Sequence, residues 1–129
     1  MTTVFADSFY DFALLSRADE SHSQAVEFSR SHRGRLITTE WVLTEIADGF
    51  ASSPKRHAFV RLHERLRRDD RVSIVPATPE WFERGCGLYQ RRADKDWSLT
   101  DCISFVVMQD YGLTGDHHFE QAGFVALLK

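Results

Sequence analysis

The sequence predicts an α/β fold with a mainly parallel sheet covered by helices on both faces. Short apolar runs, each long enough for one strand, alternate with longer segments that have helical periodicity. Parallel strands need such helical crossovers between them, which bury the sheet on both sides. No internal repeat or linker divides the 129 residues, so we expect a single domain over residues 1–129.

The first half of the chain contains two of the predicted strands. The expected elements, in order, are a strand over TTVFAD that ends at Asp7, a helix over residues 9–15, an amphipathic helix over 19–32, a strand over RLITT (35–39) and a helix over 41–50. Gly34 follows the second helix and is a typical residue to end it.

The second half continues the alternation of strands and helices. The expected elements are a helix that begins at Pro54 and runs into the basic turn RRDDR, a strand over VSIVP (72–76), a helix capped by Thr78 with Pro79 at its first position, a loop over RADKDW, a helix over 98–108 and a closing strand over FVALL (124–128).

The composition is that of a soluble globular protein, with 43% hydrophobic and 27% charged residues. No apolar run reaches the roughly 18 residues of a membrane span. The first residues carry acids and no basic region, which argues against a secretory signal peptide. Cys86 and Cys102 lack metal-type spacing, so we expect reduced core thiols and a cytoplasmic protein.

Charge is distributed unevenly along the chain. The segment from Lys55 to Lys95 has 11 basic and 6 acidic residues, whereas the remainder has 5 basic and 13 acidic ones. A basic helix surface beside an acidic pocket suits a polyanionic ligand: the basic surface would hold the polyanion, and the acidic pocket would process it. Solvated helix faces are the simpler alternative for the basic run.

Four carboxylates are candidates for a functional site, because functional groups of open α/β sheets gather beyond the carboxyl ends of the strands. Asp7 ends the first strand, Glu45 lies in the helix after the second, Asp101 begins an apolar run and Asp116 precedes a polar turn. Each also has a local explanation. Asp7 suits a helix N-cap, Glu45 a solvated position, Asp101 a capping box with Ser98, and Asp116 a turn.

Together the four acids predict a divalent-cation site. Carboxylates brought within a few ångströms raise one another's pKa values, and a cation between them removes this cost. Oxygen ligands without paired His or Cys favour Mg²⁺ or Mn²⁺ over zinc. Such a site orients a phosphodiester, activates water and stabilises charge on the leaving oxygen.

Four segments resemble, in order, the PIN-domain ribonucleases, specifically the VapC-type toxins of prokaryotic toxin–antitoxin pairs: FADSFYDFALL, TTEWVLTEIADGF, KDWSLTDCISFVVM and GDHHFEQAGF. The resemblance implies a three-layer α/β/α PIN-like domain and a type II toxin that cleaves RNA with Mg²⁺, or with Mn²⁺ as a substitute. It assigns Asp7, Glu45, Asp101 and Asp116 to the catalytic and metal-binding set. It also implies a homodimer and a cognate VapB-type antitoxin.

Further residues have weaker assignments. Asp96 is either a loop aspartate or an outer acid of the site, and His117 and His118 match the family string without a firm role. The candidates for contacts with the RNA backbone are the basic side chains between Arg61 and Arg71, with Arg91, Arg92 and Lys95.

The segment before Asp116 departs from the family pattern, because it is several residues shorter than in VapC-type toxins. Gly112 can end the preceding helix, or the helix ends earlier and Asp110 and Tyr111 are extended. This departure supports an alternative function: a catalytically impaired PIN-like protein that binds RNA or an antitoxin without cleavage.

A phosphoacceptor receiver domain is a second alternative, since it is also α/β with acids at strand ends. It requires an acid after the third strand and a lysine after a later one. VSIVP ends without an acid, and no lysine follows the later strands before Lys129, which disfavours this class.

Overall fold

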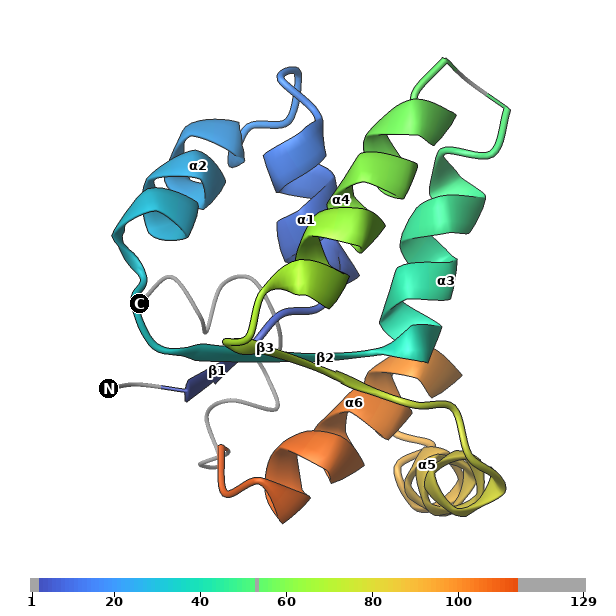
Figure 1. The fold of residues 1–129 in the computed structure, drawn as a ribbon. Helices are drawn as coiled ribbons and strands as arrows, with labels where there is room; N and C mark the ends of the chain where they lie inside the picture. The colour runs from blue at the N-terminus through green and yellow to red at the C-terminus, as the bar shows by residue number, and fades with distance from the viewer. Residues whose placement is uncertain (1–2, 53, 114–129) are drawn as a thin grey trace.

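A parallel sheet forms the centre of the computed structural model, which describes residues 3–52 and 54–113 (Figure 1). Its described strands are β1 (Thr3–Phe5), β2 (Arg35–Thr39) and β3 (Val72–Val75), in the spatial order β1-β2-β3. Val4 lies opposite Leu36, and Leu36 lies opposite Val72. The parallel arrangement predicted for these strands is confirmed, and all of them direct their carboxyl ends to one edge of the sheet.

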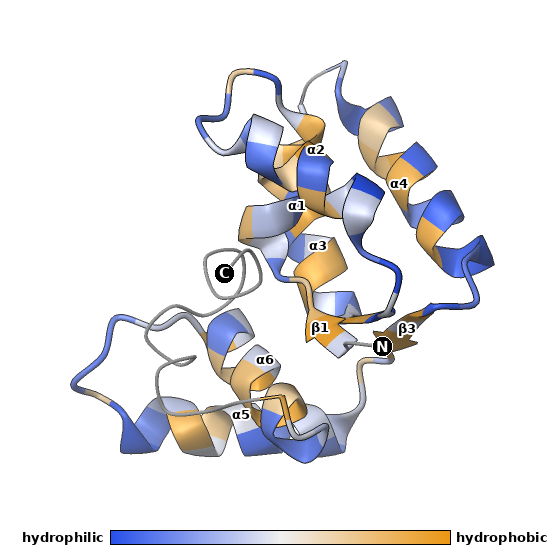
Figure 2. Ribbon diagram, turned by 90° about the vertical axis from the view of Figure 1, so that its left-hand side faces the viewer, coloured by the Kyte–Doolittle hydropathy of each residue, from blue (hydrophilic) through white to orange (hydrophobic). Residues whose placement is uncertain are grey.

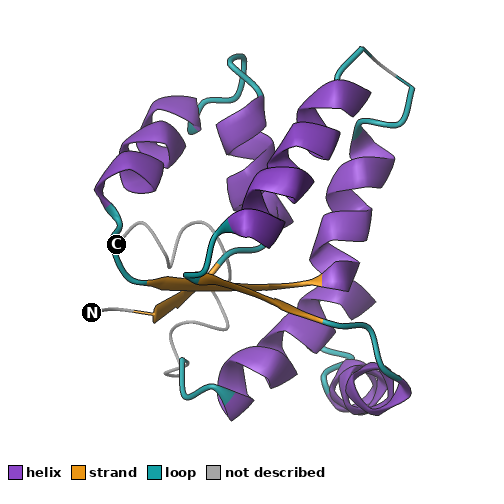
Figure 3. Cartoon of the chain, in the orientation of Figure 1, coloured by secondary structure: helices purple, strands orange, loops and turns teal. Residues whose placement is uncertain are grey.

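Helices cover both faces of the sheet, which confirms the three-layer α/β/α architecture. The described helices are α1 (Ser8–Leu15), α2 (His22–Ser31), α3 (Glu40–Gly49), α4 (Arg56–Arg68), α5 (Pro79–Arg91) and α6 (Leu99–Asp110). Helices α1–α4 lie on one face, and α5 and α6 lie on the other (Figures 1 and 3). Among the described residues, no helix has the length and apolar character needed to cross a membrane.

The hydrophobic core joins the strands to the helices on either side. Phe5, Ile37 and Val75 contribute one buried side chain from each strand, and Ile46 of α3 and Phe105 of α6 belong to the same cluster. Figure 2 shows hydrophobic and hydrophilic residues alternating along α4, as expected of an amphipathic surface helix. Helix α6 is instead buried from Cys102 to Met108, because it packs between the sheet and α5.

Helices α5 and α6 approach each other closely at Gly85. A Cβ atom at this position would lie 2.3 Å from Cγ1 of Ile103 and 3.2 Å from its Cα. The absence of a side chain at Gly85 therefore sets the distance between the two helices.

Most of the predicted helix ends are confirmed. The Thr78 hydroxyl accepts a hydrogen bond from the Trp81 amide at 3.4 Å, with Pro79 at the first helical position. Ser98 and Asp101 form the predicted capping box at the start of α6. Cys86 and Cys102 are free thiols, as predicted; Cys102 lies in the core, whereas Cys86 is only half-buried.

Helix α6 continues through Asp110, so the alternative in which Asp110 and Tyr111 are extended is wrong. Asp110 is held in the last turn by a bidentate ion pair with Arg84, at 2.7 and 3.0 Å. Gly112, at φ 68°, ends the helix as predicted, and the Leu113 amide bonds the Met108 carbonyl at 2.9 Å.

Two helices begin later than predicted. Helix α2 begins at His22 because the Asp19 carboxylate accepts a hydrogen bond from the Ser21 amide at 2.8 Å, which forms a local turn. Helix α4 begins at Arg56, and Pro54 lies in the turn before it. Strand β3 ends at Val75, since Pro76 has no amide to donate. The predicted strand over 124–128 and Asp116 lie outside the described residues.

Candidate active site

Three of the four predicted acids come from separate elements near one edge of the sheet. Asp7 follows β1 and caps α1, where it accepts a hydrogen bond from the Tyr10 amide at 3.3 Å. Glu45 lies in the second turn of α3, which begins directly where β2 ends. Asp101 lies in the first turn of α6. The parallel strands thus bring the starts of α1 and α3 to a common edge.

The charges of Asp101 and Glu45 both act on Asp7. The pKa of Asp7 is raised from 3.8 to about 7, first by burial and then by the negative charges of Asp101 and Glu45, while the amides of Tyr10 and Phe9 lower it. Asp7 therefore changes its charge near neutral pH, which is unusual for an aspartate and typical of functional sites.

Each of these carboxylates also has a neighbouring donor. The Ser8 hydroxyl donates to Oε1 of Glu45, and the Ser98 amide donates to Oδ2 of Asp101 at 3.2 Å. Within residues 3–52 and 54–113, no three His, Cys, Asp or Glu side chains converge closely enough to bind one metal ion. Ser8 belongs to α1, so its bond joins Glu45 of α3 to the helix that Asp7 caps, whereas Asp101 is held within its own helix by the capping box.

The donor chemistry nevertheless fits a divalent cation of the Mg²⁺ type. Asp7, Glu45 and Asp101 offer only oxygen atoms, which Mg²⁺ and Mn²⁺ prefer. The raised pKa of Asp7, caused first by burial and then by its acidic neighbours, is the cost that a nearby cation would remove.

Asp11 is a further buried acid near this edge that the sequence analysis missed. Its side chain is only 3% exposed, and its Oδ2 atom has no hydrogen-bond partner in the described part of the chain. Burial and the charge of Asp7 raise its pKa to about 8. An acid four residues after Asp7, in the otherwise apolar helix SFYDFALL, was the signal that could have identified it.

The weaker candidates occupy exposed positions. Asp96 lies in the exposed loop before α6, as a loop aspartate would. Several of the proposed RNA-contacting cations form surface ion pairs: Arg68 with Glu64, Arg71 with Asp69, and Arg92 with Asp94. Such pairs are weak, so a polyanion can compete for these cations. Asp116, His117 and His118 lie outside the described residues.

Comparison with known proteins gives the family. The PIN domain model matches residues 9–125. Among solved structures, the chain is similar to VapC20 of Mycobacterium tuberculosis, described as a sarcin–ricin loop cleaving toxin, with a TM-score of 0.79 and 25% identity over 95% of this chain and 96% of that one. A search of curated proteins finds no match. The chain therefore belongs to the PIN domain family, and its likeness to VapC20 supports a VapC-type PIN ribonuclease.

Proposed function

We propose that this protein is a divalent-metal-dependent endoribonuclease that acts as the toxin of a type II toxin–antitoxin pair. The observation that supports the proposal is that Asp7, Glu45 and Asp101 come from three separate elements and that the charges of the other two contribute to the raised pKa of Asp7. Membership of the PIN family and the likeness to a VapC toxin support the same activity.

The residues that would hold the cation are Asp7, Glu45 and Asp101, with Asp116 as the fourth member of the set. A bound Mg²⁺ or Mn²⁺ supplies activation of water and stabilisation of charge on phosphate oxygens. The Ser8 hydroxyl positions one oxygen of Glu45, and the start of α6 positions Asp101.

The partners follow from the family. We propose an RNA substrate, a VapB-type antitoxin, a homodimeric assembly and a cytoplasmic location. Because VapC20 is described as cleaving the sarcin–ricin loop, ribosomal RNA that contains this loop is the first substrate to test.

The test is cleavage of total and ribosomal RNA by antitoxin-free protein with Mg²⁺ or Mn²⁺, and with EDTA. We expect RNA cleavage only when the metal is present. Asp101→Asn should abolish this cleavage, and Asp48→Asn should retain it. Asp48 is a matched control because it is an exposed acid on α3, three residues after Glu45. Cutting that persists in EDTA would refute the metal-dependent mechanism.

A catalytically impaired PIN-like protein is the second candidate. It is favoured by the end of α6 at Gly112, which leaves only residues 113–115 before Asp116. Mn²⁺ binding that is intact in calorimetry, together with no cleavage of any RNA, would select this function over the nuclease.

A further inference from the structure

A cavity of about 300 Å³ lies between α1, α2, α4 and the sheet, next to the candidate active site. Its walls are mainly apolar and include Leu14, Phe28, Leu36 and Leu62. Ala6, the residue before Asp7, also lines it. The volume is at the lower end of the roughly 300–1,000 Å³ range of small-molecule sites.

The buried polar side chains that line the cavity include Asp11 and Thr38, and the Thr38 hydroxyl already donates to the Ala6 carbonyl. The Asp11 side chain is 3% exposed, and its Oδ2 atom lacks a hydrogen-bond donor among the described residues. Natural proteins pair almost all buried polar atoms, so an exception needs an explanation. A ligand that donates hydrogen bonds to a carboxylate would supply the missing partner.

The remaining polar groups near Asp11 belong to the same cavity. The Tyr10 phenol is hydrogen-bonded to Ser29, and its pKa is raised to about 12, first by burial and then by the charge of Asp11, whereas Arg65 lowers it. All four side chains line the cavity. Acceptors therefore lie inside, and a guanidinium lies within electrostatic range of them.

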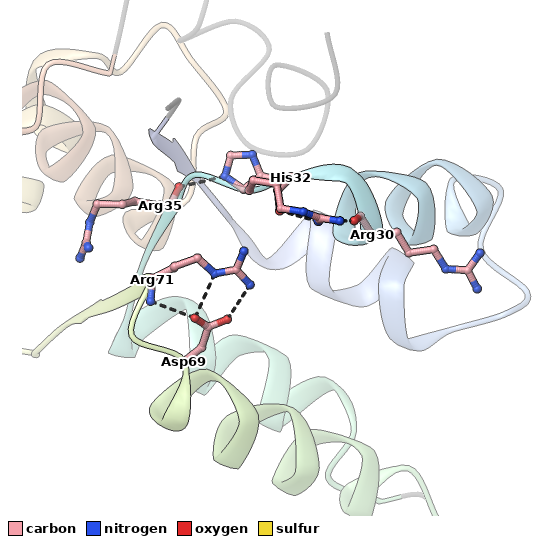
Figure 4. A network of polar contacts seen from close by, with 6 residues as sticks. Arg30, His32, Arg35, Asp69 and Arg71 are labelled. Atoms are coloured by element: carbon pink, nitrogen blue, oxygen red, sulfur yellow. Dashed lines mark hydrogen bonds and ion pairs between the residues drawn. The ribbon is translucent and has the colours of Figure 1, made fainter.

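The mouth of the cavity is cationic. Arg65 is exposed on α4 and lines the cavity, as does Arg71, which directly precedes β3. The Arg71 guanidinium pairs with Asp69 at 3.2 Å (Figure 4). His32 also lines the cavity and contacts the Arg35 carbonyl at 3.1 Å. An anionic group of a ligand would be attracted here, while an apolar ring would be favoured between the leucine and phenylalanine walls.

We propose that this cavity binds a guanine nucleotide, with the base inward at Asp11 and the phosphate at Arg65. Guanine carries two adjacent donors, N1–H and N2–H, which match the two oxygens of the ionised Asp11 carboxyl. Burial and the charge of Asp7 raise the pKa of Asp11 to about 8 in the free protein, and donors that bond the charged form would lower it again. Adenine, cytosine and uracil each place an acceptor beside a single donor group on that edge, so none offers this pair. The proposal concerns binding and holds whether or not the protein cleaves RNA.

The guanine has two possible sources, a free nucleotide and a nucleotide within RNA. The cavity adjoins the candidate active site because Asp11 follows Asp7 by one helical turn. A guanine of an RNA substrate held in this cavity would lie beside the carboxylates of the candidate active site. It would make cleavage selective for a base, which contacts with the RNA backbone alone cannot do.

The first test is calorimetric titration of the full-length wild-type protein with GMP, IMP, AMP and CMP. IMP is the sharpest comparison, because it lacks only the exocyclic amine of guanine. We expect GMP to bind at least tenfold more tightly than each of the others. Equal or tighter binding of AMP or IMP, or no binding of GMP, would overturn the proposal.

Two variants locate the ligand in the cavity. Asp11→Asn replaces one acceptor by a donor at nearly unchanged volume, so GMP affinity should fall at least tenfold while the thermal melt stays cooperative. Arg65→Gln should remove most of the advantage of GMP over guanosine. Arg30→Gln is the matched control, because Arg30 is an exposed arginine of α2 that does not line the cavity. Unchanged GMP affinity in both cavity variants would refute this location.

Competition distinguishes the two sources. The Asp101→Asn variant, loaded with GMP, is titrated with a short single-stranded RNA and with the same RNA carrying inosine in place of guanine. Displacement of GMP only by the guanine RNA assigns the site to RNA, and no displacement by either assigns it to free nucleotide. Equal displacement by both RNAs would overturn guanine recognition.

Discussion

Replacement of Asp7 by asparagine should stabilise the folded protein, and by more at high pH. Burial and two acidic neighbours raise the pKa of Asp7 from 3.8 to about 7. Between these values the folded state binds more protons than the unfolded state, so this group makes stability fall as pH rises. One pKa unit corresponds to about 1.4 kcal/mol, so the cost above pH 7 is about 4 kcal/mol at most. Asparagine removes the charge and remains a good N-cap.

The assay is urea denaturation with EDTA at pH 5 and pH 8.5, for the wild type, Asp7→Asn and Asp48→Asn. Asp7→Asn should have the higher unfolding free energy at both pH values. Its advantage over the wild type should be about 2 to 3 kcal/mol larger at pH 8.5 than at pH 5, because part of the cost of the Asp7 charge is already present at pH 5. Asp48→Asn removes the same charge from an exposed position and should show no such growth. A difference between Asp7→Asn and wild type that is equal at both pH values would refute the reasoning.

Three further outcomes are expected. Gly85→Ala should destabilise the protein by about 1–3 kcal/mol in a urea titration, because the added Cβ meets Ile103 at 2.3 Å. Gly87→Ala is the control and should be neutral or slightly stabilising, because its Cβ meets only a flexible side-chain end at 3.3 Å. Ser98→Ala removes the acceptor for the Asp101 amide and should lower the unfolding free energy by about 1 kcal/mol, and an unchanged urea midpoint would contradict the role of the capping box. Mn²⁺ at about 100 times its Kd should stabilise the wild type by about 2.7 kcal/mol, seen as a higher Tm in calorimetry. An unchanged Tm at saturation would contradict a clustered-acid site, as would an equal rise in Asp101→Asn.

The sequence was sufficient for the architecture because its signals are local. Apolar runs and turn residues define the strands, and the Ser98–Asp101 capping box depends on residues three apart on one helix. The helix ends that were misplaced depend on competing local bonds, such as the one that Asp19 accepts before α2.

The arrangement within the site depends on packing between distant segments. The hydrogen bond between Ser8 and Glu45 joins residues 37 positions apart, and no sequence pattern in either segment predicts it. Asp11 was missed for a related reason. An acid in an eight-residue helix is usually solvated, and only the packing of α1 against α2 and the sheet shows that this one is buried.

The position of Asp7 has a consequence for how such a gene changes with time. The cap that Asp7 provides can be kept by asparagine, whereas its charge lowers stability at neutral pH and above. Folding therefore does not preserve the aspartate, and only selection for the use of its charge does. When that selection is relaxed, we expect copies with asparagine at this position to accumulate as well-folded proteins that still display the surfaces by which partners recognise the chain.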